Sequence, residues 1–192
     1  MALINYPKRE IVYKVVYYGT GLGGKTTNLR YLHANLDPKV RGELVTVATE
    51  TERTLFFDFL PLNLGVVEGY KARFALYTVP GQSEYGESRR MILKGADGII
   101  FVADSSAVRR QANVEALEDM MDSLKEHKVS LKAVPWVLQY NKRDLTDALP
   151  VETLEKDLNA SGVPSFEAVA TEGKAVFSTL KTLSQMVVQR QS

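Results

Sequence analysis

The feature that most constrains this chain is a glycine-rich loop between a predicted strand and a predicted helix. Residues 19–26 read GTGLGGKT, which matches the pattern GxxxxGK[ST], and they follow the apolar, β-branched run IVYKVVYY. Glycines lack a Cβ, so successive backbone N–H groups can turn inward around phosphate oxygens. The helix that follows directs the positive end of its dipole at the same place. The spacing therefore predicts a phosphate-binding loop in an α/β fold.

Two side chains of this loop indicate what else it holds. Lys25 would supply a mobile positive charge for the phosphates, and the Thr26 hydroxyl would reach a magnesium ion. We expect the loop to bind through nine consecutive residues, which are Gly19, Thr20, Gly21, Leu22, Gly23, Gly24, Lys25, Thr26 and Thr27.

Composition excludes several other classes of function. The chain has 192 residues, which predicts a single domain over 1–192. Lys and Arg total 24 against 23 Asp and Glu, so no excess charge favours nucleic acid. The absence of cysteine excludes disulfides and a thiol nucleophile, and agrees with a cytoplasmic protein. No apolar run approaches the ~20 residues of a membrane span, and no lipidation motif is present, so we expect no direct membrane anchor.

Apolar runs alternate with amphipathic segments along the whole chain. This alternation predicts an α/β fold of three layers, with a mostly parallel six-stranded sheet covered by helices on both faces. Strands are expected near 10–18, 43–48, 73–79, 98–103, 134–140 and 165–169. Helices are expected at 111–127, at 173–189 and after Pro150. Ligands of such folds bind beyond the carboxyl ends of the strands, so the loops there should form the site.

The loop after the fifth predicted strand reads NKRD, which indicates guanine. The Asp144 carboxylate would accept hydrogen bonds from N1–H and the 2-amino group of guanine. Adenine presents an acceptor at N1 and would leave the carboxylate unpaired. Asn141 would tie this loop to the phosphate loop, and the stem of Lys142 would cover one face of the base. Val169 and Ala170 follow the sixth strand, where a backbone N–H, preferably that of Ala170, would face guanine O6; an ordinary strand end is the alternative.

Two further loops have the residues of a switch that senses the third phosphate. Gly81 would let a backbone N–H approach the γ-phosphate, and Gln82 could orient the attacking water. Thr54 could complete the magnesium shell when that phosphate is present. The aromatic run 56–59 that follows is either a core strand or a partner-binding face next to the switch.

These residues together resemble the Ras-like small GTPases, and more closely the bacterial MglA group of gliding and polarity GTPases. The resemblance covers nearly the whole chain through the segments YYGTGLGGKTTNLRYL, ATETERTLFFDFLPL, FALYTVPGQ, LKGADGIIFVADS and QYNKRDL. TVPGQ is the most specific segment, because most small GTPases have an aspartate where Thr78 stands. That difference predicts a magnesium shell one negative charge short, and hence slow intrinsic hydrolysis.

The resemblance implies a GTP-hydrolysing switch that controls cell polarity and surface motility, by gliding or type IV pili, with GTP, GDP and Mg²⁺ as ligands. It implies that Arg53 acts as an internal arginine finger beside Gln82, with Arg89 or Arg90 as a less favoured source. It also implies an activating partner of the roadblock/LC7 fold, an MglB-like homodimer, together with an exchange factor and polarity or motility effectors. The chain alone would be a cytoplasmic monomer that partners recruit to a cell pole.

Two alternatives stay open on the sequence, and the sequence argues against a third. Thr78 also suits a GTP-dependent scaffold with negligible hydrolysis. The switch could be a general bacterial signalling GTPase unrelated to motility. A P-loop kinase of small metabolites would need an Arg-rich lid and an acidic substrate motif, neither of which is found, and the NKRD loop argues against it.

Overall fold

A computed structural model describes residues 2–48, 56–81 and 85–190, in which strands and helices alternate. The strands are β1 (Leu3–Asn5), β2 (Glu10–Tyr18), β3 (Val45–Ala48), β4 (Phe56–Val67), β5 (Tyr70–Thr78), β6 (Gly98–Asp104), β7 (Trp136–Asn141) and β8 (Ser165–Glu167). The helices are α1 (Lys25–Asn35), α2 (Gly86–Leu93), α3 (Arg110–Glu126), α4 (Val151–Leu158) and α5 (Val176–Gln189), with the 3₁₀ turns η2 (Ala107–Arg109) and η3 (Leu131–Ala133).

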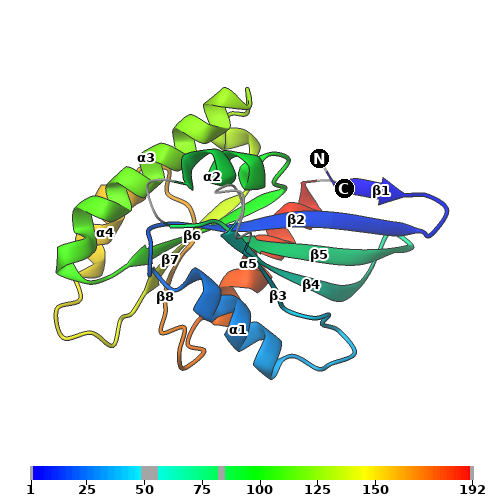
Figure 1. Cartoon of the computed structure of the whole chain (residues 1–192), viewed down its shortest axis with the longest axis horizontal. Coiled ribbons are helices and arrows are strands. Elements are labelled where there is room, and N and C mark those ends of the chain that lie inside the picture. The colour runs from blue at the N-terminus through cyan, green and yellow to red at the C-terminus, as the bar shows by residue number, and fades with distance from the viewer. Residues whose placement is uncertain (1, 49–55, 82–84, 191–192) are drawn as a thin grey trace.

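The strands form one sheet in the order β3-β4-β5-β2-β6-β7-β8, with β1 beside the start of β2 (Figure 1). The pairs from β5 through β2, β6 and β7 to β8 are parallel. The pairs β3·β4, β4·β5 and β1·β2 are antiparallel. Because β2, β6 and β7 run parallel, their carboxyl ends and the loops that follow them meet at one edge of the sheet.

Helices cover both faces of the sheet, which gives two apolar cores. One core packs Leu29 and Leu32 of α1 and Leu183 of α5 against the sheet. The other packs Ile92 of α2, the α3 residues Leu117 and Met120, and Leu154 of α4 against the opposite face. Figure 1 shows α2, α3 and α4 on one side of the sheet and α1 and α5 on the other. Strands β6 and β7 are buried along their whole length, as expected for parallel strands covered on both sides.

The predicted fold class is confirmed, with two more strands than the six expected. The three-residue β1 is too short to produce a pattern of alternation. The longer β4 contains Pro61 and Gly65, which are unfavourable in central strands, and its register shifts between Asn63 and Val66. The predicted strand bounds otherwise shift by a few residues, as at β8, which ends at Glu167 instead of 169.

The aromatic run belongs to β4, and its side chains alternate between the two faces of the strand. Asp58 and Leu60 are buried, whereas Phe57 and Phe59 are half-buried and lie against Tyr77, with ring centroids 5.8 Å and 4.9 Å away. The run is therefore a strand with a partly covered aromatic face.

Candidate functional site

The glycine-rich loop connects β2 to α1 in a conformation that requires glycine. Gly24 adopts φ of 104° at the N-cap of α1, and a Cβ there would lie 2.0 Å from Nδ2 of Asn141. A Cβ on Gly19, with φ of 130°, would lie 2.1 Å from the carbonyl oxygen of Val102. Residues of β6 and β7 thus lie directly against the loop, and only glycine fits at these two positions.

Lys25 is held inside this loop. Its side chain is buried, and its Nζ donates hydrogen bonds to the carbonyl oxygens of Gly19 (2.8 Å) and Thr20 (2.7 Å). The pKa of Lys25 is lowered to about 7, mainly because the side chain is buried; Arg89 and Arg109 also lower this pKa, and Asp58 acts in the opposite direction. A phosphate group would restore the charge of this ammonium, so the geometry suits an anionic ligand.

A carboxylate that sequence reasoning missed lies beside Thr26. Asp58 of β4 is buried and accepts hydrogen bonds from the hydroxyls of Thr26 (2.6 Å), Thr46 (2.8 Å) and Thr78 (3.0 Å). The Asp58 backbone N–H also donates to the Thr78 hydroxyl, at 2.8 Å. A neighbouring strand thus places a carboxylate beside Thr26, which the charge deficit expected from Thr78 did not take into account.

The threonine cluster around Asp58 opens into a cavity of about 420 Å³. Its lining includes the loop from Leu22 to Thr27, together with Thr46, Asp58 and Thr78. The threonine hydroxyls and the Asp58 carboxylate offer oxygen atoms, the ligand type that Mg²⁺ prefers. No group of three or more acidic, His or Cys side chains suited to a metal occurs among the described residues. A Mg²⁺ ion here would therefore complete its shell with phosphate and water, as it commonly does.

Asn141 joins the base-recognition loop to the phosphate loop, as predicted. Its Nδ2 donates to the carbonyl oxygen of Gly23 (2.8 Å), and its Oδ1 accepts from the backbone N–H of Ala170 (2.9 Å). The N–H expected to face guanine O6 is therefore bound to Asn141 in this structure. The N–H of Val169 likewise donates to the carbonyl oxygen of Lys174, at 3.2 Å.

A second cavity, of about 170 Å³, lies between the phosphate loop and the NKRD loop. Asp144 is exposed at this cavity, which Leu22, Lys142, Ala170 and Thr171 also line. Lys142 adopts φ of 65° and its Nζ pairs with the buried Asp104 carboxylate at 2.7 Å. The structure thus brings the predicted base-binding residues together at one small cavity next to the phosphate loop.

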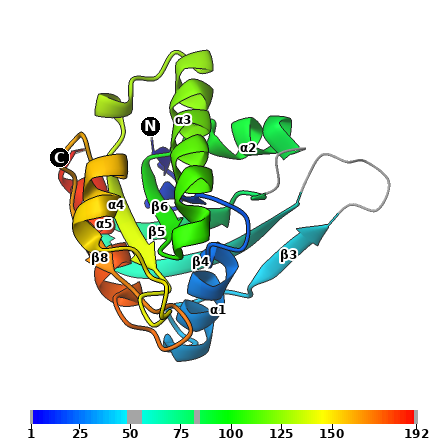
Figure 2. The ribbon, with the colours of Figure 1, turned by 90° about the vertical axis from the view of Figure 1, so that its left-hand side faces the viewer.

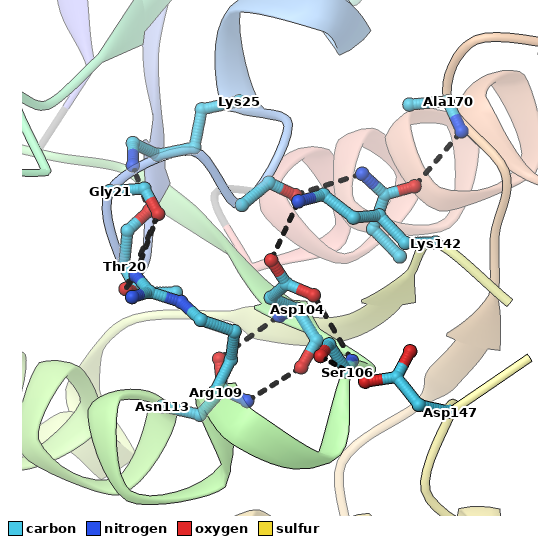
Figure 3. Close-up of polar contacts among 12 residues, drawn as sticks. Thr20, Gly21, Lys25, Asp104, Ser106, Arg109, Asn113, Lys142, Asp147 and Ala170 are labelled. Carbon is cyan, nitrogen blue, oxygen red and sulfur yellow. Dashed lines mark hydrogen bonds and ion pairs between the residues drawn. The ribbon is translucent and has the colours of Figure 1, made fainter. Parts of the chain in front are cut away.

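Arg109 is a further residue that the sequence did not reveal. It lies at the end of η2, and its Nη2 donates to the Thr20 hydroxyl (2.6 Å) and to the carbonyl oxygen of Gly21 (2.9 Å). Asp104 positions the turn, because its Oδ1 accepts from the backbone N–H of Ser106 (3.1 Å). Figure 3 shows Lys142 paired with Asp104, Asp104 bound to Ser106, and Arg109 bound to Thr20 and Gly21 of the phosphate loop.

The remaining predicted residues divide into two groups. Gly81 lies against the phosphate loop, since a Cβ on it would be 2.3 Å from the Cα of Gly21. Arg53, Thr54 and Gln82 lie outside the described residues. The other arginines considered for catalysis form ion pairs with α3, Arg89 with Asp119 (2.7 Å) and Arg90 with Glu126 (3.1 Å).

Comparison with known proteins agrees with this geometry. The sequence profile of the ADP-ribosylation factor family matches residues 3–187. The mutual gliding-motility protein MglA of Myxococcus xanthus (strain DK1622) is 52% identical over 188 residues, which cover 98% of this chain and 96% of that protein. Human ADP-ribosylation factor-like protein 4C is 28% identical over 186 residues, covering 92% of this chain and 87% of that protein. Bovine ADP-ribosylation factor-related protein 1 is 26% identical over 154 residues, covering 80% and 70%.

None of the helices in the described part of the chain is long and apolar enough to span a bilayer. The profile match and the 52% identity each extend over nearly the whole chain. The chain therefore belongs to the ADP-ribosylation factor family of small GTPases, and within it to the MglA group.

Proposed function

We propose that this GTPase is a nucleotide-dependent switch that controls cell polarity and surface motility. The observation that carries the nucleotide assignment is the pair of hydrogen bonds of Asn141, which ties the loop beside the base cavity to the phosphate loop. The motility assignment is supported by the relative named for gliding motility, which is 52% identical to this chain. In this proposal residues 1–192 act as a single G domain.

Within this site each end of the nucleotide would contact different residues. The backbone N–H groups of the loop from Gly19 to Thr27, with Lys25, bind the phosphates. Asp144 pairs with the guanine edge, and Lys142, held by Asp104, covers one face of the base. Guanine is then preferred because adenine would leave the Asp144 carboxylate without a hydrogen-bond donor.

Asp58 would let this chain bind Mg²⁺ with a threonine at position 78. Thr26 and, in the GTP state, Thr54 are the proposed ligands. The Thr26 hydroxyl donates its proton to Asp58, which leaves its oxygen lone pairs free for a cation. Bound Mg²⁺ would neutralise charge on the β- and γ-phosphates. Asp58 thus places a negative charge beside the metal without being a ligand itself.

For hydrolysis we propose that Gln82 orients the attacking water, that Gly81 offers its N–H to the γ-phosphate and that Arg53 supplies the arginine finger. The position of Gly81 against Gly21 supports its part, because it brings the loop after β5 onto the phosphate loop. Partner-stimulated turnover would come from an MglB-like roadblock/LC7 homodimer that presses the switch segments into place. An exchange factor and polarity effectors complete the cycle, and they recruit a cytoplasmic, monomeric chain to a cell pole.

Calorimetry with GTP, GDP and ATP tests the nucleotide assignment. We expect binding of both guanine nucleotides, with ATP weaker by about 10³ or more. The variant Asp144→Asn should lose most of that discrimination, and equal affinity of the wild type for ATP would refute the base assignment.

Phosphate release with and without an MglB-like roadblock protein tests the switch. We expect slow release by the chain alone and strong stimulation by the partner, with Gln82→Leu binding nucleotide normally but turning over slowly. Deleting the gene and scoring polarity and motility separates this function from general signalling. The scaffold alternative loses its main motivation, because Asp58 supplies the charge that Thr78 lacks.

A further inference from the structure

A large cavity lies at the end of the sheet opposite the nucleotide loops. It is a groove of about 1190 Å³ bordered by the end of α3, the segment 128–136, the loop 160–163 and the end of α5. Trp136 at the start of β7 lines it, whereas Asn141 at the end of β7 belongs to the nucleotide site. A strand of this length separates the two by about 17 Å. In Figure 2 the end of α3 lies at the upper end of the molecule, away from α1.

The floor of this groove is apolar and recessed. Val134 and Trp136 are buried, and Met121, Val163 and Met186 are half-buried. None of the large apolar side chains that are exposed in the described residues lines the groove. A surface that inserts into lipid needs protruding apolar side chains, so this concave floor suits a partner that inserts side chains of its own.

The rim of the groove is basic. Lys125, Lys128, Lys132 and Arg190 line it, and no Asp or Glu does so. Lys125 pairs with Asp122 at 2.8 Å on the exposed face of α3. The side chains of Lys128, Lys132 and Arg190 have no hydrogen-bond or ion-pair partner within the described segments.

Stabilisation of helix ends does not account for this charge. Lys125 and Arg190 do lie at the C-terminal ends of α3 and α5, where a cation complements the helix dipole. Lys128 and Lys132, however, lie outside the α-helices. Neither a helix end nor a described partner accounts for Lys128 and Lys132, so the rim is complementary to a ligand with the opposite charge.

We infer that this basic groove, defined by Met121, Lys128, Lys132, Trp136, Met186 and Arg190, docks an acidic amphipathic helix of a partner protein. The helix inserts an apolar stripe against Trp136 and the two methionines, and its flanking carboxylates face the rim. None of the groove residues belongs to the phosphate loop, the base loop or the predicted switch segments. The docking is therefore independent of the bound nucleotide, and it can hold the protein in place in both states of the switch.

The test is a selection from a displayed library of helical peptides of about 18 residues, panned on the full chain loaded with GDP. The double variant Lys128→Glu/Lys132→Glu serves for counter-selection. Lys8→Glu/Lys39→Glu is the matched control, because both lysines are exposed and lie outside the groove. Binding of each selected peptide is followed by fluorescence of Trp136, the only tryptophan of the chain.

We expect enriched peptides to combine an apolar stripe with Asp and Glu. The groove variant should weaken their binding at least about tenfold, whereas the control should change it less than twofold. Raising NaCl from about 0.15 M to about 0.5 M should also weaken it. Exchange of GDP for a non-hydrolysable GTP analogue should leave the affinity unchanged.

Several results would overturn the inference. These are the enrichment of no peptide, enrichment without an acidic excess, or equal binding to the groove variant. A nucleotide-dependent affinity would equally refute docking in both states. Sedimentation with phosphatidylserine vesicles that the groove variant abolishes would reassign the groove to lipid. Unchanged GDP binding by the groove variant excludes misfolding as the cause of any loss.

Discussion

Replacement of Asp58 by asparagine tests the proposed metal site most directly. Asp58→Asn keeps the shape of the side chain but removes the charge that three threonine hydroxyls now contact at 2.6, 2.8 and 3.0 Å. Hydrogen bonds to a charged group contribute about 1.5–3 kcal/mol each. The hydroxyls can rotate to accept from the new amide, so we expect a net loss of folding stability of about 1–3 kcal/mol, well within what a domain tolerates.

The effect on Mg²⁺ should be larger than the effect on folding. Loss of a group that orients a metal ligand commonly costs about 10- to 100-fold in metal affinity. That range corresponds to about 1.4–2.8 kcal/mol. We therefore expect the Mg²⁺ concentration that half-maximally retains GDP to rise by about 10- to 100-fold in Asp58→Asn.

The assay is the dissociation rate of a fluorescent GDP measured across a Mg²⁺ titration. Asp122→Asn is the matched control, because its side chain is 69% exposed on α3, far from the site. Thermal unfolding without Mg²⁺ measures the folding cost separately. If folded Asp58→Asn and Asp122→Asn share the Mg²⁺ dependence of the wild type, Asp58 does not act through the metal and the reasoning fails.

Three further changes test other parts of the site. Gly21→Val should slow GTP turnover by about a hundredfold while GDP still binds, because its Cβ would lie 3.1 Å from the Gly81 carbonyl oxygen; wild-type turnover would contradict this. Arg109→Met should speed GDP release by about tenfold, because it removes the hydrogen bonds to Thr20 and Gly21. The control is the neighbouring substitution Arg110→Met, which should not change the release rate. Because the pKa of Lys25 is lowered to about 7 and bound phosphate would raise it, Mg·GDP binding at pH 8 should take up roughly one proton, and less below pH 7. Calorimetry in buffers of different ionisation enthalpy measures that uptake, and equal heats would refute it.

The sequence predicted those parts of the site that local patterns specify. The loop from Gly19 to Thr26 follows a β-branched run, and NKRD follows a fully buried strand, so spacing and order sufficed to place both at one edge of the sheet. Asn141 was correctly expected to contact the phosphate loop, because parallel strands bring these two loops together.

Residues that act at the site from outside any local motif were missed. Arg109 reaches Thr20 from 89 positions away, and nothing in its short 3₁₀ turn marks it. Asp58 lies in β4, which was not among the six predicted strands because it contains a proline and a glycine. The sequence nevertheless contained one indication that Asp58 has a buried partner. Asp58 stands in alternation with the buried Leu60 and Leu62, and a carboxylate in an apolar register needs a partner.

Asp58 and Thr78 together show why a motif at one position does not define a metal site. β4 and β5 are antiparallel, and Phe59 pairs with Tyr77, so Asp58 and Thr78 face each other across the two strands. Directly opposed side chains are about 5 Å apart, so a carboxylate moved from one strand to the other reaches nearly the same place. The position of the carboxylate on β4 has a structural consequence. The charge beside Thr26 now belongs to β4, only four positions after the proposed ligand Thr54, so occupancy of the metal site would fix the strand into which the switch segment leads.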